Sequence, residues 1–483
     1  MIEDLLIDVD NNLRAALECI DHSAQGIAFV TGSGGRLLGV LTDGDIRRAL
    51  LRGRTLETPI SEVYIRNCAS LHISASREKI QASLRGKITC IPLLDDQDRP
   101  VDYASNFRHR RIPFAEPYLG GNEFAYVTEC LQTNWISSQG TFIGKFEAMF
   151  AEKTHTRHAV ASSNGTSALH LAMAALGIGP GDEVIVPDLT FAASASSIVH
   201  AGATPVLVDV DKQDWNLNLN AVRAAITPRT KAIMVVHLYG QPADMDGILR
   251  IAKEHGLFVV EDAAEALGSY YKGAHVGSLG DAAAFSFFGN KLITTGEGGM
   301  VTFRDEGLAK RARILRDHGM DPERRYWHVE IGYNYRMTNI QAALGLAQME
   351  KLEVLIERKR EIARRYREGL ADLPFLTLPS QLDGRENIYW AFSILWNEEL
   401  AGLSVERAQA KLLNLGIETR PLFLPLHDMP PFKKYAGDRD FSVSTSLSKT
   451  GFSLPSFVTL EETEIRHVVG AVKRLCEAKV LLS

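Results

Sequence analysis

Cysteine is scarce in this chain of 483 residues: the five that are present are scattered, and no two have the Cys-x-x-Cys spacing of a metal or redox site. We therefore expect free thiols in a reducing compartment and no metal site. Long apolar runs are also missing, since none approaches the roughly 20 residues that a membrane-spanning helix requires. The first residues, Met1 to Asp4, are acidic, where a secretory signal peptide would be basic and then apolar. These absences favour a cytoplasmic protein without a membrane partner.

An excess of positive charge is missing too. Lys and Arg number 53 against 59 Asp and Glu, which gives a formal net charge of −6 and argues against general binding to nucleic acid. The composition that remains, 45% hydrophobic and 23% charged, is that of an ordinary globular protein. Because 483 residues exceed what one small core accommodates, we expect a small domain at 1–108 and a larger unit with two parts, 112–350 and 351–483.

The first hundred residues contain an internal repeat. Two short apolar segments, 26–30 and 37–41, flank a Gly- and Ser-rich turn and precede a helical segment at 45–51. Segments 89–94 and 101–103 repeat the strand–turn–strand order around an Asp-rich turn. This repeat resembles a tandem CBS module.

In the CBS family, residues at a Thr-x-x-Asp spacing, here Thr42 and Asp45, contact the phosphate and ribose of an adenine nucleotide. The chemistry suits them, because a hydroxyl at a helix start donates to phosphate and a carboxylate accepts from ribose hydroxyls. The resemblance therefore implies a nucleotide site at Thr42 and Asp45, and at most one per chain, because the second repeat has Arg108 in place of the acid. Two alternatives stay open: Thr42 or Asp43 only caps the helix, or the module only adds contact area between subunits.

From about residue 112 the pattern changes to alternating strands and helices, which is typical of an α/β domain with a mostly parallel sheet. The expected strands are continuous apolar runs, as in a sheet that helices cover on both faces. They lie at 183–187, 205–210, 232–237, 258–261, 283–287 and 299–303. A long charged amphipathic helix at 349–366 leads into a smaller α+β part. Ligands of open α/β sheets bind beyond the carboxyl ends of the strands, so polar residues at those ends are site candidates.

Four motifs follow one another along this region. In the first, a turn of small residues opens a helix, where exposed N–H groups and the helix dipole favour an anion such as a phosphate. Gly165 allows a close approach to the backbone, and Thr166 and Ser167 add hydroxyl donors. A plain helix cap is the alternative for this motif.

The other three motifs lie after strands. Phe191 follows the strand at 183–187. Asp262 ends a second strand and is followed by Glu265, and Ser286 and Lys291 follow a third, directly before a glycine-rich segment. In this order the four motifs resemble the DegT/DnrJ/EryC1/StrS family of sugar aminotransferases over roughly residues 112–480. The resemblance implies a fold-type-I transferase that depends on pyridoxal 5'-phosphate (PLP).

The family resemblance implies a role for each of these residues. Lys291 would be the Schiff-base lysine and Ser286 a phosphate ligand, and Phe191 would stack on the pyridine ring. Asp262 would hold the ring nitrogen protonated through a charge-assisted hydrogen bond, which makes the ring an electron sink. Glu265 would lie near the phenolic oxygen and the substrate. Sugar dehydratases of the same fold carry His in place of Lys291, so this lysine favours transamination over deoxygenation.

Four segments are similar to the subgroup of this family that aminates C4 of GDP-4-keto-6-deoxy-mannose: 134–138, 294–299, 324–328 and 332–339. In that subgroup the loop that bears Asn334 completes the phosphate site of the neighbouring subunit, which implies a homodimer or a higher homo-oligomer. Further candidates for binding the nucleotide sugar are Trp135, Ser137, Tyr326, His328, Arg420 and His427. An arginine fork such as that of Arg420 suits a diphosphate.

The sequence thus predicts an aminotransferase that acts on a nucleotide-linked 4-keto-6-deoxy sugar, with glutamate, the family's common donor, as the source of the amino group. Three alternatives stay open. The keto-sugar could be linked to UDP or dTDP or react at C3. The chain could be a nucleotide-sensing regulator with a vestigial catalytic part. Tyr326, Trp327 and His328 could pack in a subunit interface. The intact set of Lys291, Asp262 and Ser286 argues against a vestigial site.

Overall fold

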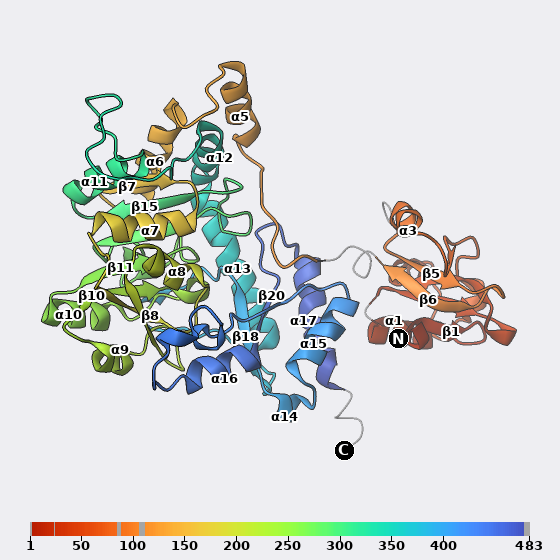
Figure 1. Ribbon diagram of the computed structural model, residues 1–483. Helices are drawn as coiled ribbons and strands as arrows, with labels where there is room; N and C mark the ends of the chain where they lie inside the picture. Colours follow the sequence, from red (N-terminus) through yellow and green to blue (C-terminus); the bar gives the residue numbers. More distant parts are fainter. Residues whose placement is uncertain (1, 24, 85–87, 106–111, 478–483) are drawn as a thin grey trace. The chain divides into compact units, whose positions relative to one another are not determined.

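The computed structural model describes residues 2–23, 25–84, 88–105 and 112–477. The chain forms two compact units: residues 1–112 with 413–417, and residues 113–412 with 418–483 (Figure 1). In the described part of the chain, no helix is long and apolar enough to span a membrane.

The N-terminal unit consists of two halves with similar elements. The first half comprises β1 (Leu6–Asp8), α1 (Leu13–Ser23), β2 (Ile27–Thr31), β3 (Leu37–Thr42) and α2 (Asp43–Leu51), and the second comprises β4 (Leu71–His72), α3 (Arg77–Ser83), β5 (Cys90–Leu94) and β6 (Pro100–Ser105). In each half the first strand pairs parallel with the second, and the second pairs antiparallel with the third. The internal repeat expected from the sequence is therefore present.

The hairpins of the two halves correspond residue for residue. Ile27 pairs with Thr42 in the first hairpin and Cys90 pairs with Ser105 in the second, so both partners lie 63 positions later. Each hairpin also shifts its register at the last residue of its first strand. Cys90 shares a buried apolar cluster with Phe29 and other residues of the first half, so the two halves have part of their core in common.

The large unit is organised around a seven-stranded sheet with the order β7-β15-β14-β11-β10-β8-β9. The strands are β7 (His158–Ser162), β8 (Glu183–Pro187), β9 (Thr204–Val208), β10 (Thr230–Val236), β11 (Phe258–Asp262), β14 (Ala282–Ser286) and β15 (Gly299–Phe303). β15 is antiparallel to both its neighbours, and all other neighbouring strands are parallel. The expected mostly parallel sheet is confirmed, and β7 is a strand that the sequence patterns did not predict.

Helices cover both faces of this sheet (Figure 1). Alternate strand residues point to opposite faces: in β10, Met234 packs with one apolar cluster, and Ile233 and Val235 pack with another. One face carries α7 (Gly165–Ala175), α8 (Ala193–His200) and α11 (Glu306–Arg316); the other carries α6 (Thr141–Lys153), α9 (Leu219–Ala225), α10 (Met245–His255) and α12 (Asn339–Met349). Burial on both faces explains why the strands are continuous apolar runs.

The C-terminal part has a four-stranded antiparallel sheet with the order β16-β18-β20-β19. Its strands are β16 (Leu376–Thr377), β18 (Phe392–Trp396), β19 (Arg420–Pro421) and β20 (Gly451–Leu454), and its helices are α13 (Leu352–Leu370), α14 (Glu398–Ala401), α15 (Val405–Asn414), α16 (Ser442–Thr450) and α17 (Glu462–Glu477). Helix α13 is the long amphipathic helix expected at 349–366. The remaining elements of the unit are α5 (Glu123–Gln132) and a small sheet of β12 (Tyr270–Tyr271), β13 (Ala274–His275) and β17 (Arg385–Glu386).

Candidate active site

A cavity of about 650 Å³ opens at the carboxyl ends of the parallel strands β11 and β14. It brings together eight of the residues that the sequence predicted for cofactor binding and catalysis: Gly165, Thr166, Ser167, Phe191, Asp262, Glu265, Ser286 and Lys291. These residues come from segments up to 126 positions apart, from Gly165 to Lys291, so the fold assembles them.

The small-residue turn at the start of α7 forms one wall of the cavity. Asn164 caps the helix by accepting a hydrogen bond from the Ser167 amide at 2.8 Å, and the Ser167 hydroxyl accepts one from the Asn164 amide at 3.1 Å. Gly165 lies so close to the next wall that a Cβ atom there would be 2.8 Å from the Cβ of Ser286. The capping alternative is therefore true of Asn164 and Ser167, while Gly165, Thr166 and Ser286 form a small polar cradle at a helix N-terminus, which suits a phosphate.

Asp262 ends β11 and is buried with 6% of its surface exposed. Its carboxylate accepts hydrogen bonds from the Ser194 hydroxyl at 2.7 Å and from the Ala264 amide at 3.2 Å. Burial raises the pKa of Asp262, and the hydrogen bond from Ser194 offsets part of that rise. A buried carboxylate of this kind is stabilised by a cationic N–H partner such as a protonated pyridine nitrogen.

Lys291 points its amine toward two groups. The Nζ atom lies 3.5 Å from Oε1 of Glu265 and 4.1 Å from the ring centroid of Trp390. Burial raises the pKa of Glu265, although the charge of Lys291 opposes the rise, and Oε2 of Glu265 accepts a hydrogen bond from the Tyr239 amide at 2.8 Å. The amine is thus presented to the cavity at a fixed position.

Phe191 lies on the wall of the cavity with 61% of its surface exposed, so it is not a core residue. Its ring centroid is 5.8 Å from that of Phe423, which lines the cavity as well. An exposed aromatic face at the opening of a polar cavity is suited to stacking on a planar ligand.

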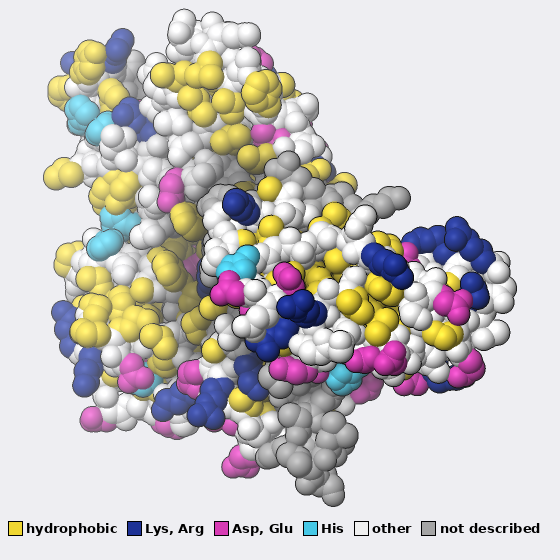
Figure 2. All heavy atoms as spheres, turned by 90° about the vertical axis from the view of Figure 1, so that its right-hand side faces the viewer, with side chains coloured by type: hydrophobic (Ala, Val, Ile, Leu, Met, Phe, Trp, Pro, Cys, Tyr) yellow, Lys and Arg dark blue, Asp and Glu magenta, His cyan; other side chains and the backbone are white. Residues whose placement is uncertain are grey.

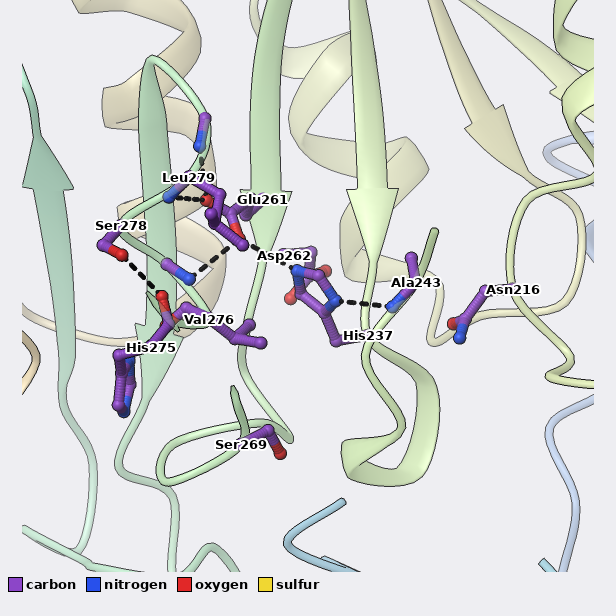
Figure 3. A network of polar contacts seen from close by, with 12 residues as sticks. Asn216, His237, Ala243, Glu261, Asp262, Ser269, His275, Val276, Ser278 and Leu279 are labelled. Atoms are coloured by element: carbon purple, nitrogen blue, oxygen red, sulfur yellow. Dashed lines mark hydrogen bonds and ion pairs between the residues drawn. The ribbon is translucent and has the colours of Figure 1, made fainter. Parts of the chain in front are cut away.

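Two adjacent residues of β11, Glu261 and Asp262, point to opposite sides of the strand. Asp262 faces the cavity, whereas Glu261 is fully buried and binds the turn at 276–280 and His237 (Figure 3). His237 accepts a hydrogen bond at Nδ1 from the Ala243 amide at 3.1 Å, so its proton is on Nε2, which donates to Glu261 at 3.1 Å. This network supports the strand end that carries Asp262.

The other predicted site residues do not line the cavity. These are Asn334, Trp135, Ser137, Tyr326, His328, Arg420 and His427. Most of them are exposed; Tyr326, for example, has 74% of its surface accessible. His427 is instead bound through Nδ1 to the buried carboxylate of Asp188 at 2.7 Å and stacks on Phe441 at 4.5 Å.

Several further cavity residues were given no role from the sequence, among them His170, Thr190, Tyr335, Trp390 and Phe423. Two of these had a local signal, since Thr190 directly precedes Phe191 and Tyr335 lies in the segment 332–339.

In the N-terminal unit, Thr42 and Asp45 bind each other. The Thr42 hydroxyl accepts from the Asp45 amide, and the Asp45 carboxylate accepts from both the amide and the hydroxyl of Thr42, which forms a capping box at the start of α2. Arg48 also donates to Asp45 at 2.5 Å. The helix-capping alternative therefore describes this pair, and Arg108 lies outside the described residues.

Residues 117–473 match the DegT/DnrJ/EryC1/StrS aminotransferase family. The chain belongs to this family. Residues 1–52 match the CBS domain. The chain is therefore a PLP-dependent sugar aminotransferase that carries a CBS domain at its N-terminus.

Three relatives show how far the likeness extends. GDP-perosamine synthase of Caulobacter vibrioides is 52% identical over 369 residues, which cover 76% of this chain and 98% of the relative. GDP-perosamine synthase of Escherichia coli O157:H7 is 46% identical and covers 76% of this chain and 99% of the relative. A candidate sugar aminotransferase of Streptococcus pneumoniae, solved in its PLP form, has a TM-score of 0.71 and 29% identity, and covers 76% of this chain and 99% of its own.

The cavity of this aminotransferase fits PLP. A polar cradle at a helix N-terminus suits the phosphate, a buried carboxylate suits the ring nitrogen, and Lys291 lines the same cavity. When bound, PLP supplies an electron sink that stabilises negative charge on a substrate carbon.

Proposed function

We propose that this aminotransferase moves an amino group from glutamate to C4 of GDP-4-keto-6-deoxy-mannose. The observation that carries the proposal is the 52% identity to the GDP-perosamine synthase of Caulobacter vibrioides across 98% of that protein. Lys291, which a sugar dehydratase of this fold would replace with His, favours transamination.

In this proposal Lys291 and Asp262 are the catalytic residues. Lys291 Nζ takes and returns the proton at the substrate carbon, and its position 3.5 Å from Glu265 keeps a carboxylate beside the ammonium form. Asp262 holds the proton on the ring nitrogen. Gly165, Thr166, Ser167 and Ser286 bind or shape the phosphate site, and Phe191 stacks on the ring.

We further propose that a second copy of the chain completes each site. Asn334, Tyr326 and His328 are exposed and lie outside the cavity of their own chain, as residues acting in a neighbouring subunit would. Large apolar side chains are also exposed in and around α5, among them Leu119, Phe124, Leu131, Trp135 and Ile136. Figure 2 shows apolar side chains gathered at the height where α5 lies in Figure 1. Exposed apolar surface of this kind is typical of a subunit interface.

For substrate binding we propose Trp135, Ser137, Tyr326, His328, Arg420 and His427. We propose domain limits at 1–108, 112–350 and 351–483.

For the N-terminal module we favour assembly over nucleotide sensing, because the carboxylate of Asp45 is already bound to Thr42 and Arg48.

The experiment is an assay of the purified chain with PLP and glutamate against GDP-, UDP- and dTDP-linked 4-keto-6-deoxy sugars. The expected result is turnover of the GDP-linked sugar well above the others, with the amino group at C4 of the product. Preferred turnover of a UDP- or dTDP-linked sugar, or amination at C3, would refute the proposal.

A further inference from the structure

Trp390 touches the reacting amine, although no motif marks it. Its ring centroid lies 4.1 Å from Lys291 Nζ, and its Nε1 donates a hydrogen bond at 2.9 Å to the carbonyl of Asn290, the residue before Lys291. We propose that the indole face of Trp390 holds the Lys291 amine whenever that amine is not bonded to the cofactor, and that the buried Lys359 is the positioning residue that fixes Trp390. The inference deepens the proposed function, because it rests on the catalytic role of Lys291.

An ammonium group over the face of an indole is attracted by the ring quadrupole, and more strongly when water is excluded. The side chain of Lys291 is only 14% exposed, so the contact is largely shielded from solvent. The carboxyl group of Glu265 lies 3.5 Å from the same amine. The Lys291 amine therefore contacts one carboxyl group and one aromatic face.

The indole ring of Trp390 is itself held from several sides. It is parallel to the Tyr239 ring, with 6.3 Å between centroids and 4° between planes, and the Phe114 ring meets it edge-on at 6.3 Å. The hydrogen bond from Nε1 to the Asn290 carbonyl fixes the side-chain torsion angle that orients the ring. A ring that is fixed in this way keeps its face toward Lys291.

Lys359 holds the backbone of Trp390. It lies on α13, is buried with 4% of its surface exposed, and donates from Nζ to the Trp390 carbonyl at 2.9 Å. The same Nζ contacts the carbonyl and the hydroxyl of Ser456, so three acceptors meet the three donors of an ammonium. Burial lowers the pKa of Lys359 to about 7. The Lys359 side chain links two segments, around 390 and 456, that are 66 positions apart in sequence.

The first test separates this role from simple substrate contact. Both half-reactions use Lys291, but only one uses the sugar, so each is followed in the holoenzyme by the change in visible absorbance with glutamate or with GDP-4-keto-6-deoxy-mannose. We expect Trp390→Leu to slow both half-reactions by the same factor, about 2- to 30-fold. Slowing of the sugar half-reaction alone would overturn the inference and make Trp390 a sugar contact.

The second test needs no substrate. The amine must lose its proton before it can bond to the cofactor, so the rate at which PLP attaches to the apoenzyme depends on pH. The indole face favours the ammonium, and we expect Trp390→Leu to move the midpoint of that rate profile to lower pH by about 0.4 to 1.5 pH units. An unchanged midpoint would overturn the inference. If the parent enzyme does not turn over the GDP-linked sugar, the proposed function is wrong. The rate of PLP attachment still tests the role of Trp390, because it needs no sugar.

The positioning role of Lys359 is tested against a matched lysine. Lys359→Met should slow both half-reactions, and it should add no further slowing to Trp390→Leu, because both changes act through the same ring. Lys351→Met, at the start of the same helix, breaks a partly buried pair with Glu123 and should lower stability without changing either half-reaction. Parent-like half-reaction rates in Lys359→Met, or fully additive slowing in the double variant, would refute the positioning role.

Discussion

Glu261→Gln should destabilise the large unit by several kcal/mol, although the side chain touches neither the cavity nor solvent. Oε1 of Glu261 accepts from the amides of Leu279 at 2.9 Å and Gly280 at 2.6 Å, and Oε2 accepts from the Gly277 amide at 2.8 Å and from His237 at 3.1 Å. Glutamine offers one oxygen and one NH₂ group, so whichever way it turns, two donors face another donor. His237 cannot reverse its roles, because its Nδ1 accepts from Ala243.

The magnitude follows from these four contacts. A hydrogen bond to a charged group contributes about 1.5–3 kcal/mol, and removing one partner from a buried charged network costs about 3–5 kcal/mol. We therefore expect Glu261→Gln to lower the free energy of unfolding by about 3–5 kcal/mol. The network in Figure 3 would lose at least two of its hydrogen bonds.

Urea unfolding followed by tryptophan fluorescence measures this loss. All five tryptophans lie after residue 134, so the signal reports the large unit and not the N-terminal one. Glu254→Gln is the matched control, since Glu254 pairs with Arg223 at the surface, and a change below about 1 kcal/mol is expected there. A loss below about 1 kcal/mol for Glu261→Gln would show that the turn at 276–280 rearranges freely and that these hydrogen bonds do not stabilise the large unit.

The stability difference between the parent and Glu261→Gln should depend on pH, and the direction follows from the pKa of Glu261. Burial alone would raise the pKa of Glu261, but His237 and the amides of Gly280 and Gly277 lower it overall. A carboxyl whose pKa is lower in the folded state stabilises the protein above its unfolded pKa of about 4.3, and that stabilisation is lost as pH falls through the folded pKa. The stability gap between parent and Glu261→Gln should therefore be full at neutral pH and narrow below about pH 4.

Other predictions address the proposed site directly. Lys291→Ala should abolish transamination and the visible absorption band of the bound cofactor while thermal unfolding stays near that of the parent; measurable turnover would remove Lys291 from the mechanism. Asp262→Asn should retain PLP but slow the chemistry by an amount on the order of several kcal/mol, and steady-state rates within a few-fold of the parent would place the pyridinium partner elsewhere. Mixing Asn334→Ala subunits with Lys291→Ala subunits should restore part of the activity, and no rescue despite verified exchange would contradict a site shared between subunits. Calorimetric titration of the full chain and of Asp45→Ala with AMP, ATP and GDP should show no heat from the N-terminal module, whereas heat that Asp45→Ala removes would establish nucleotide sensing.

The sheet and the eight cavity residues could be predicted because their signals are local. An apolar run followed by a polar residue marks both a buried parallel strand and the ligand side of the sheet, as at Asp262 and Ser286. Strand β7 was not predicted. It has only five residues, and no turn residues separate it from the small-residue motif that follows it. In the N-terminal unit, strands of two or three residues such as β1 and β4 are too short to show any period.

Trp390 and Phe423 could not be predicted, for a different reason. Each reaches the cavity from the C-terminal part, more than 90 positions after Lys291, and an aromatic residue next to an apolar strand is ordinarily part of a core. The candidates Tyr326, His328 and Asn334 differ from Trp390 and Phe423. Their segments were singled out from the sequence, but these residues do not line the cavity of their own chain. In the proposed function their roles depend on a second copy of the chain, which local patterns do not describe.

The two N-terminal hairpins match residue for residue. Residues 27–42 and 90–105 have the same length and the same strand pairing, and in both hairpins the register shifts at the last residue of the first strand. The match to the CBS domain nevertheless ends at residue 52. An ancestral duplication would leave this trace: the shared skeleton persists because folding depends on it, while the side chains that once had a common task diverge. A chimaera with residues 27–42 grafted in place of residues 90–105 would therefore meet a hairpin of compatible length and pairing.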